Sequence, residues 1–188
     1  MLNDAQFDPE TLIKPLNPTA FGIDLHWLTH AQGALEVARV VKEVHPRVPV
    51  IMGGYSATFF HRELMDYPQV DYVLRGDSTE EPLRMLVEAI MQGGAMEDIP
   101  NLTWRDRNGG VVENPLTYCP ASLDYLGNNY KYMIRSALKY GDWKSLRAFW
   151  NWWSYPITMV LTCRGCSHDC AFCGGSSSAR PTPSGAGS

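Results

Sequence analysis

The chain has 188 residues, of which 45% are hydrophobic and 19% are charged, and its formal net charge is −4. These values are ordinary for a globular protein of one or two domains that buries a hydrophobic core. A sequence pI near 5.7, without any cluster of Lys or Arg, argues against a nucleic-acid-binding surface. We find no signal peptide and no apolar run of membrane-spanning length, so we expect a cytosolic protein that does not enter a membrane.

The first half of the chain alternates short apolar runs with patterns typical of helices. Buried strands are predicted at 20–27, 48–54 and 70–76. Helices are predicted at 28–46, 59–68 and 78–94. Strands that alternate with helices of this length predict an α/β fold with a parallel sheet and right-handed crossovers.

Ligands of such sheets bind beyond the carboxyl ends of the strands. The segments that follow the three predicted strands are 28–32, 53–58 and 76–79. We therefore expect these segments to lie along one edge of the sheet and to form the binding site. Ser78 is predicted to cap the following helix, with Glu81 as its capping-box partner.

The second half of the chain begins with a predicted β-hairpin at 101–115, whose turn is Asn108-Gly109-Gly110. Residues 126–156 hold four of the six tryptophans and have a broken helical pattern. We interpret them as a linker helix that packs through its aromatic side chains. The predicted division is a first domain at 1–98, a hairpin and Trp-rich linker at 99–155, and a C-terminal segment at 156–188.

Four of the five cysteines fall within eleven residues, with the spacing C-x2-C-x3-C-x2-C. They are Cys163, Cys166, Cys170 and Cys173. This spacing is too tight for several independent disulfides, so it favours shared metal coordination over a disulfide pair.

Two kinds of metal site remain for these cysteines. Four thiolates could close a tetrahedral zinc site, whereas three thiolates could hold a [4Fe-4S] cluster and leave its fourth iron open. Zinc sites made of two cysteine pairs usually separate the pairs by a dozen or more residues. Here the pairs lie three residues apart, which favours iron.

The motif Cys166-x3-Cys170-x2-Cys173, with Phe172 before the last cysteine, resembles the cluster motif of the radical S-adenosylmethionine (SAM) superfamily. The apolar run at 157–166 resembles the first barrel strand that leads into that motif. The resemblance implies that the three cysteines each ligate an iron, that SAM binds the fourth, and that Phe172 packs near the cluster and the adenine. Cys163 stands where the family often has serine, and we expect it not to ligate the cluster.

The same resemblance implies an activity. A reduced cluster cleaves SAM to a 5′-deoxyadenosyl radical, which removes hydrogen from a substrate, and the electron comes from a donor such as flavodoxin or ferredoxin. The substrate is a small molecule that the sequence does not identify, and no residue is predicted as a catalytic acid, base or nucleophile.

Three further segments resemble the latter half of the cobalamin (B12)-binding domain that often precedes a radical SAM barrel. They are GIDLHW at 22–27, VPVIMGGYSAT at 48–58 and VDYVLRGDSTEEPL at 70–83. The resemblance implies that Gly53, Gly54, Ser56 and Gly76 contact cobalamin, where glycine lets the backbone approach the nucleotide tail. The family's D-x-H-x-x-G loop has no match here, because Asp24-Leu25-His26 lies inside a predicted strand.

The resemblances together imply a partial, Rossmann-like cobalamin-binding domain, a linker, and the start of a radical SAM (β/α) barrel. We expect a chain truncated at both ends and inactive alone, whose parent uses SAM for methyl transfer or a radical rearrangement. Two alternatives stay open. One is a zinc-stabilised α/β binding module, and the other is a cobalamin carrier without catalysis.

Overall fold

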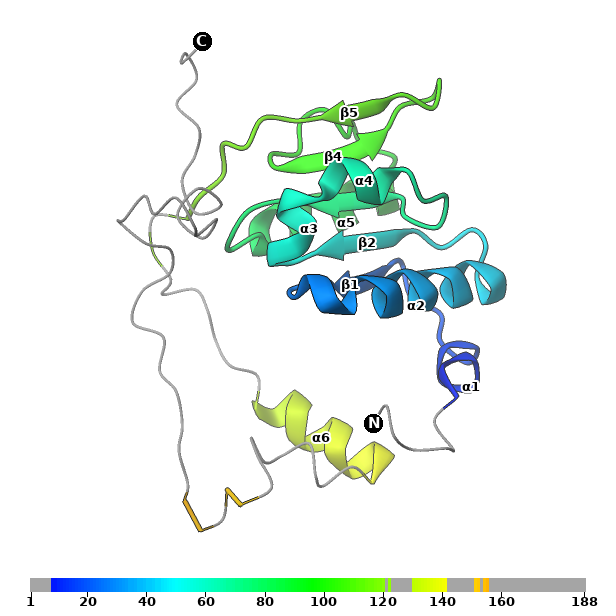
Figure 1. Ribbon diagram of the computed structural model, residues 1–188, viewed down its shortest axis with the longest axis vertical. Coiled ribbons are helices and arrows are strands. Elements are labelled where there is room, and N and C mark those ends of the chain that lie inside the picture. Colours follow the sequence, from blue (N-terminus) through cyan, green and yellow to red (C-terminus); the bar gives the residue numbers. More distant parts are fainter. Residues whose placement is uncertain (1–7, 121, 123–129, 142–150, 153, 156–188) are drawn as a thin grey trace. The chain divides into compact units, whose positions relative to one another are not determined.

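The computed structural model describes residues 8–120, 122, 130–141, 151–152 and 154–155. The described residues up to 119 belong to one compact unit and the later ones to a second. The first unit contains the following elements in chain order: α1 (Pro9–Ile13), β1 (Phe21–Asp24), η1 (Leu28–His30), α2 (Ala31–Val44), β2 (Val50–Gly53), α3 (Tyr55–Phe59), α4 (His61–Met65), β3 (Tyr72–Leu74), α5 (Glu80–Gln92), β4 (Leu102–Arg105) and β5 (Val111–Glu113) (Figure 1).

The five strands form one sheet in the order β1-β2-β3-β4-β5. The pairs β1–β2 and β2–β3 are parallel, whereas β3–β4 and β4–β5 are antiparallel. In the register of the first pair, Phe21 lies opposite Val50 and Asp24 lies opposite Gly53. The predicted α/β fold and its three parallel strands are confirmed, and the predicted hairpin extends the same sheet.

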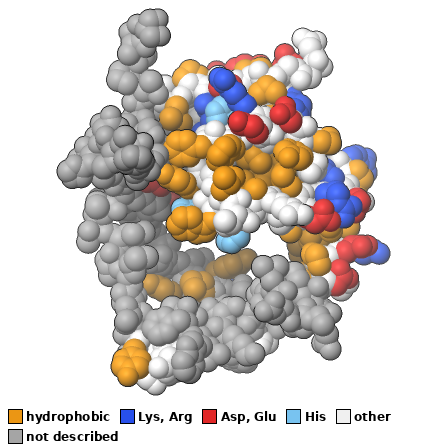
Figure 2. Space-filling model, in the orientation of Figure 1, with side chains coloured by type: hydrophobic (Ala, Val, Ile, Leu, Met, Phe, Trp, Pro, Cys, Tyr) orange, Lys and Arg blue, Asp and Glu red, His pale blue; other side chains and the backbone are white. Residues whose placement is uncertain are grey.

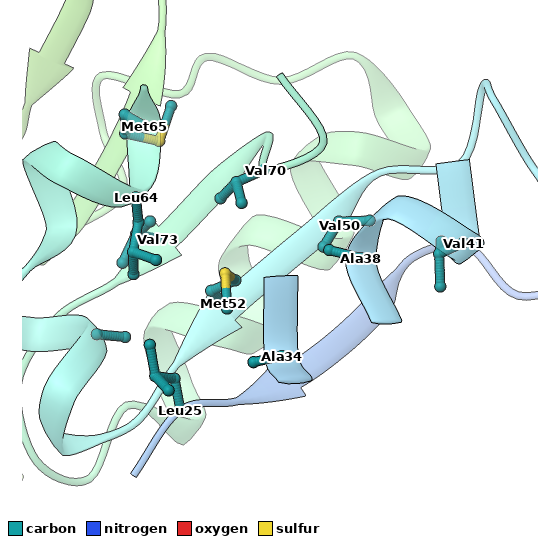
Figure 3. Close-up of a cluster of buried hydrophobic side chains, with 11 residues drawn as sticks. Leu25, Ala34, Ala38, Val41, Val50, Met52, Leu64, Met65, Val70 and Val73 are labelled. Atoms are coloured by element: carbon teal, nitrogen blue, oxygen red, sulfur yellow. The ribbon is translucent and has the colours of Figure 1, made fainter. Parts of the chain in front are cut away.

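Helices cover both faces of the sheet. Figure 1 shows α2, α3 and α4 on one face and α5 on the other. The first face buries the cluster of Figure 3, which consists of Leu25, Ala34, Ala38, Val41, Val50, Met52, Ala57, Leu64, Met65, Val70 and Val73. The second face buries Ile51, Leu74, Leu86, Ile99, Leu102 and Trp104.

The central strand β2 shows why both faces are apolar. Val50 and Met52 belong to the first cluster and Ile51 to the second, as the two-residue period of a strand requires. Full burial of each such side chain stabilises the fold by about 1.5–3 kcal/mol. Packing on both faces therefore holds the sheet rigid, and the loops at its edges begin from fixed positions.

Three predicted element boundaries are wrong. The strand predicted at 20–27 ends at Asp24, because the carbonyl oxygens of Leu25 and His26 accept hydrogen bonds from the start of α3 instead of continuing the sheet. The helix predicted at 59–68 spans only His61–Met65, as α4, and Phe60, which has non-helical dihedral angles (φ −106°, ψ 28°), separates it from the unpredicted short helix α3.

The third wrong boundary is the start of α5. Thr79 is its N-cap and makes no side-chain capping bond. Ser78, which was predicted to cap the helix, has φ 59° and accordingly belongs to the preceding turn. Its backbone N–H donates to Asp77 Oδ1 at 3.0 Å.

The second unit contains α6 (Tyr130–Tyr140). Ala137 is buried, whereas Tyr132, Met133 and Leu138 are exposed. Among the described residues, no helix combines the length and apolar character that crossing a membrane requires.

Candidate functional site

The carboxyl ends of β1, β2 and β3 lie at one edge of the sheet, because these strands are parallel. Gly53 is the last residue of β2, Gly54 is the N-cap of α3, and Ser56 lies in the first turn of that helix. Gly76 follows the end of β3 by two residues. The structure therefore brings the four described residues of the predicted cofactor site to the same edge.

The loop after β1 is joined directly to the start of α3. Leu25 N donates to Gly53 O at 2.7 Å, and Ser56 N donates to Leu25 O at 3.0 Å. The hydroxyl of Ser56 donates to His26 O at 3.0 Å. Ser56 is only 6% exposed, so its side chain holds two loops together whether or not a ligand is bound. Its predicted contact with cobalamin stays a prediction.

The two adjacent glycines differ in what they require of the fold. Gly54 has φ +103°, and a Cβ there would meet Asp24 Oδ1 and lie 2.9 Å from the carbonyl carbon of Leu25. Glycine at this position is required by the protein's own packing.

Gly53 has no such internal requirement. Among the described residues, the nearest atom to a Cβ on Gly53 would be Leu74 O at 3.8 Å, an ordinary contact distance. Because Gly53 has no side chain, the backbone at the end of β2 is accessible, and a large cofactor could approach it closely. On this observation the residues at the edge fit a cobalamin group.

Thr58 connects the two glycine turns. Its Oγ1 donates to Gly54 O at 3.0 Å and accepts from Gly76 N at 2.9 Å. Gly54 and Gly76 both have positive φ, at +103° and +99°. Thr58 was not among the predicted site residues, although a threonine four residues after a glycine turn is placed to bond back to it.

Aromatic side chains line the same edge. The ring centroids lie 5.0 Å apart for His26–Trp27, 6.0 Å for His26–Tyr55 and 5.1 Å for Tyr55–Phe59. Trp27 is 62% exposed and Phe59 is 42% exposed. Figure 2 shows hydrophobic side chains gathered over α3 and α4. Exposed aromatic surface beside convergent polar groups is typical of binding sites for large cofactors.

A buried arginine ties the hairpin to β3. Arg75 Nη2 donates to the carbonyl oxygens of Asn114 and, at 3.4 Å, of Leu102. Its Nη1 lies 4.0 Å from Glu113 Oε2, and its Nε has no hydrogen-bond partner in the described part of the chain. Burial lowers the pKa of Arg75. These contacts give Arg75 a structural role behind the site.

His61 lies in the same polar cluster. Its Nδ1 is 3.1 Å from Thr103 Oγ1. Burial, reinforced by the positive charge of Arg75, lowers the pKa of His61. The neighbouring Glu113 carboxylate accepts from Arg62 Nε at 2.5 Å, and this hydrogen bond lowers the pKa of Glu113.

Cys163, Cys166, Cys170, Phe172 and Cys173 lie outside the described residues. Within the part of the chain that the structure describes, no group of three or more His, Cys, Asp or Glu side chains could hold a metal ion.

Residues 3–84 match the family model described as the B12 binding domain. This range includes β1, β2, β3 and the start of α5. It therefore contains Gly53, Gly54, Ser56 and Gly76, the described residues of the predicted cofactor site.

Relatives match a larger part of the chain. The chain is 29% identical over 172 residues to an uncharacterized methyltransferase of Pyrococcus horikoshii, covering 90% of this chain and 34% of the relative. It is 26% identical over 161 residues to the hopanoid C-3 methylase of Methylococcus capsulatus, covering 83% of this chain and 28% of the relative. The chain thus spans about a third or less of the length of these relatives.

Two solved structures share the fold. The radical S-adenosylmethionine methyltransferase TsrM from Kitasatospora setae, with tryptophan substrate and a SAM analogue bound, superposes with a TM-score of 0.52 at 19% identity over 63% of this chain and 24% of that chain. The cobalamin-dependent S-adenosylmethionine radical enzyme OxsB, with aqua-cobalamin and S-adenosylmethionine bound, gives 0.50 at 16% identity over 58% of this chain and 16% of that chain.

Proposed function

We propose that this chain contains a cobalamin-binding domain of a cobalamin-dependent radical SAM methyltransferase, and that it binds cobalamin at the carboxyl edge of β1, β2 and β3; the match of residues 3–84 to the B12 binding domain supports this. The observation that carries the proposal is the open backbone at Gly53, where the protein's own packing leaves room for a side chain that the sequence does not supply. Glycine there lets a bulky ligand lie directly against the end of β2.

The residues of this edge divide into two groups. Gly53 offers its backbone, and the exposed ring of Trp27 offers apolar surface. Gly54 and Ser56 shape the loops through contacts inside the protein. In this proposal the first group touches the ligand, whereas the second fixes the geometry of the edge.

The proposed activity is that of a radical SAM enzyme. Cys166, Cys170 and Cys173 would ligate a [4Fe-4S] cluster, and Phe172 would pack beside it. When bound, the cluster supplies the electron that cleaves SAM, and cobalamin supplies a cobalt centre for methyl transfer. The proposal is supported by the spacing of the cysteines and by the methyltransferases among the relatives. Methyl transfer to a small molecule is therefore favoured over a radical rearrangement.

Anaerobic reconstitution with iron and sulfide tests the cluster. The dithionite-reduced protein is studied by electron paramagnetic resonance with and without SAM, in the wild type and in the variants Cys163→Ala and Cys170→Ala. We expect a [4Fe-4S] signal that shifts with SAM, survives the loss of Cys163, and disappears with the loss of Cys170.

Other results of this experiment identify the alternatives. Zinc bound in place of iron, with all four cysteines needed, would refute the enzyme and leave a zinc-stabilised binding module. A protein that retains cobalamin and takes up neither metal would be a cobalamin carrier.

A further inference from the structure

The hydroxyl of Thr58 bonds to both glycine turns of the site edge. It donates to Gly54 O at 3.0 Å and accepts from Gly76 N at 2.9 Å. Gly54 follows β2 and Gly76 follows β3, so a single oxygen atom links the ends of two neighbouring parallel strands. Thr58 itself is half-buried in α3.

The two bonds are not equivalent. Gly54 O also accepts from Thr58 N at 3.0 Å, so its loop keeps one hydrogen bond if the hydroxyl is removed. Gly76 N has Thr58 Oγ1 as its acceptor. The loop after β3 therefore depends on this hydroxyl more than the loop after β2 does, and an N–H that loses its acceptor in a partly buried place is costly.

The conformation of Gly76 makes this dependence important. With φ +99°, Gly76 occupies a region where glycine has wide freedom. Gly76 has no side chain that could restrain its own backbone, so a hydrogen bond to another part of the fold helps to select its conformation. A ligand that contacts both loops gains affinity when their geometry is fixed before binding.

We propose that Thr58 is a positioning residue of the cobalamin site, which holds the Gly76 loop in the conformation that binds the ligand. The inference rests on the proposed cobalamin binding. Thr58 acts through the loop, since its hydroxyl is already engaged by two backbone groups. Only a side chain that both donates and accepts at this point can fill the role, so serine can replace threonine and valine cannot.

The test uses the full 188-residue chain with Thr58→Val, Thr58→Ala and Thr58→Ser. Thr11→Val is the matched control, because Thr11 Oγ1 donates to Asp8 in an exposed position on α1. Two quantities are measured for each variant. One is the hydrogen-exchange rate of the Gly76 amide without ligand, by nuclear magnetic resonance. The other is the Kd for hydroxocobalamin, well below the unfolding temperature.

We expect Thr58→Val and Thr58→Ala to speed exchange at Gly76 and to raise the Kd, each by about tenfold, which corresponds to about 1.4 kcal/mol in binding. Thr58→Ser should stay within about threefold of the wild type in both quantities, and Thr11→Val should change neither. Thr58→Ala keeps the test valid if the valine variant does not fold.

Three outcomes would overturn the inference in different ways. Unchanged exchange at Gly76 in the valine and alanine variants would mean that the hydroxyl does not hold the loop, whatever binds there. Faster exchange with an unchanged Kd would refute the positioning role and leave cobalamin binding intact. A wild-type protein that binds no hydroxocobalamin would refute the proposed function, and this inference with it.

Discussion

Gly54 and Leu25 approach each other so closely that no side chain fits on Gly54: a Cβ there would lie 2.9 Å from the Leu25 carbonyl carbon, and Gly54 has φ +103°. This turn places the start of α3 against the loop that follows β1, where Ser56 N donates a hydrogen bond to Leu25 O. The tight turn at the edge of the sheet is thus part of the fold as well as of the proposed site.

Gly54→Ala should destabilise the protein by about 2–4 kcal/mol, because it combines backbone strain with a steric clash. Gly53→Ala should cost less than about 1 kcal/mol, since its Cβ would meet only Leu74 O at 3.8 Å among the described residues. Chemical denaturation of both variants measures the difference. Equal losses of stability would show that the turn at Gly54 is more adaptable than the structure indicates.

The same substitution at Gly53 should affect binding. Gly53→Ala is expected to weaken hydroxocobalamin binding by about tenfold, because a methyl group would separate the ligand from the end of β2. Gly22→Ala is the matched control, since Gly22 lies in β1 and no described atom comes within 4 Å of its would-be Cβ. Wild-type affinity in Gly53→Ala would remove Gly53 from the ligand contact.

His61 should make stability depend on pH. Its pKa is lowered in the folded protein, chiefly by burial, so the unfolded chain binds a proton more readily. The stability that neutral His61 provides is present above its unfolded pKa of about 6.5 and is lost as pH falls through the lower folded value.

We therefore expect the free energy of unfolding to fall as the pH is lowered below about 6.5, with a slope of at most about 1.4 kcal/mol per pH unit from this group. His61→Asn keeps an acceptor for Thr103 Oγ1 and should flatten the curve in that window. The pKa of Glu113 is lowered chiefly by its hydrogen bond from Arg62 and to a smaller extent by the charge of His61, so in His61→Asn it should remain below the usual range of a glutamate and act at lower pH. An identical pH profile in His61→Asn would contradict the assignment.

Asn101 should stabilise the segment after the hairpin. Its Oδ1 accepts from Thr117 N at 2.9 Å and Tyr118 N at 3.0 Å, and its Nδ2 donates to Tyr118 O at 3.0 Å. Its φ of 64° suits asparagine and glycine. Asn101→Gly should lower the free energy of unfolding by about 1–3 kcal/mol, because these backbone groups lose their partners.

Asn101→Ala separates the two contributions. It should cost about 1 kcal/mol more than the glycine variant, since alanine is strained at positive φ. The unfolding of both variants can be followed through the tryptophan fluorescence, to which Trp104, only 9% exposed in the folded protein, contributes. Equal stability of the two variants would mean that the backbone of residue 101 relaxes.

The three parallel strands could be predicted from the sequence, because short, continuous apolar runs are typical of strands that are buried between two layers of helices. It did not predict that the hairpin pairs with β3, since partner choice between strands depends on contacts that are distant along the chain. Ser78 was wrongly predicted as a cap because its motif fits the pattern, whereas its backbone is committed to a turn with φ 59°.

The candidate site was also predicted only in part. The glycines Gly53, Gly54 and Gly76 were singled out by the resemblance to the cobalamin-binding domain, and the structure places all three at one edge of the sheet. The sequence could not show that Gly54 must be glycine whereas Gly53 has room for a side chain. The steric clash at Gly54 would be with Leu25, which lies in another loop. Thr58 escaped notice for the same reason, since its second partner is eighteen residues away.

The measurement that tests the central claim most directly is a titration of the 188-residue chain with hydroxocobalamin, followed by absorbance and by retention on ultrafiltration. The account predicts saturation at one cobalamin per chain, with an absorbance change on binding and weaker binding in Gly53→Ala. Hydroxocobalamin that passes the filter freely, with an unaltered spectrum at protein concentrations up to about 100 μM, would contradict the account.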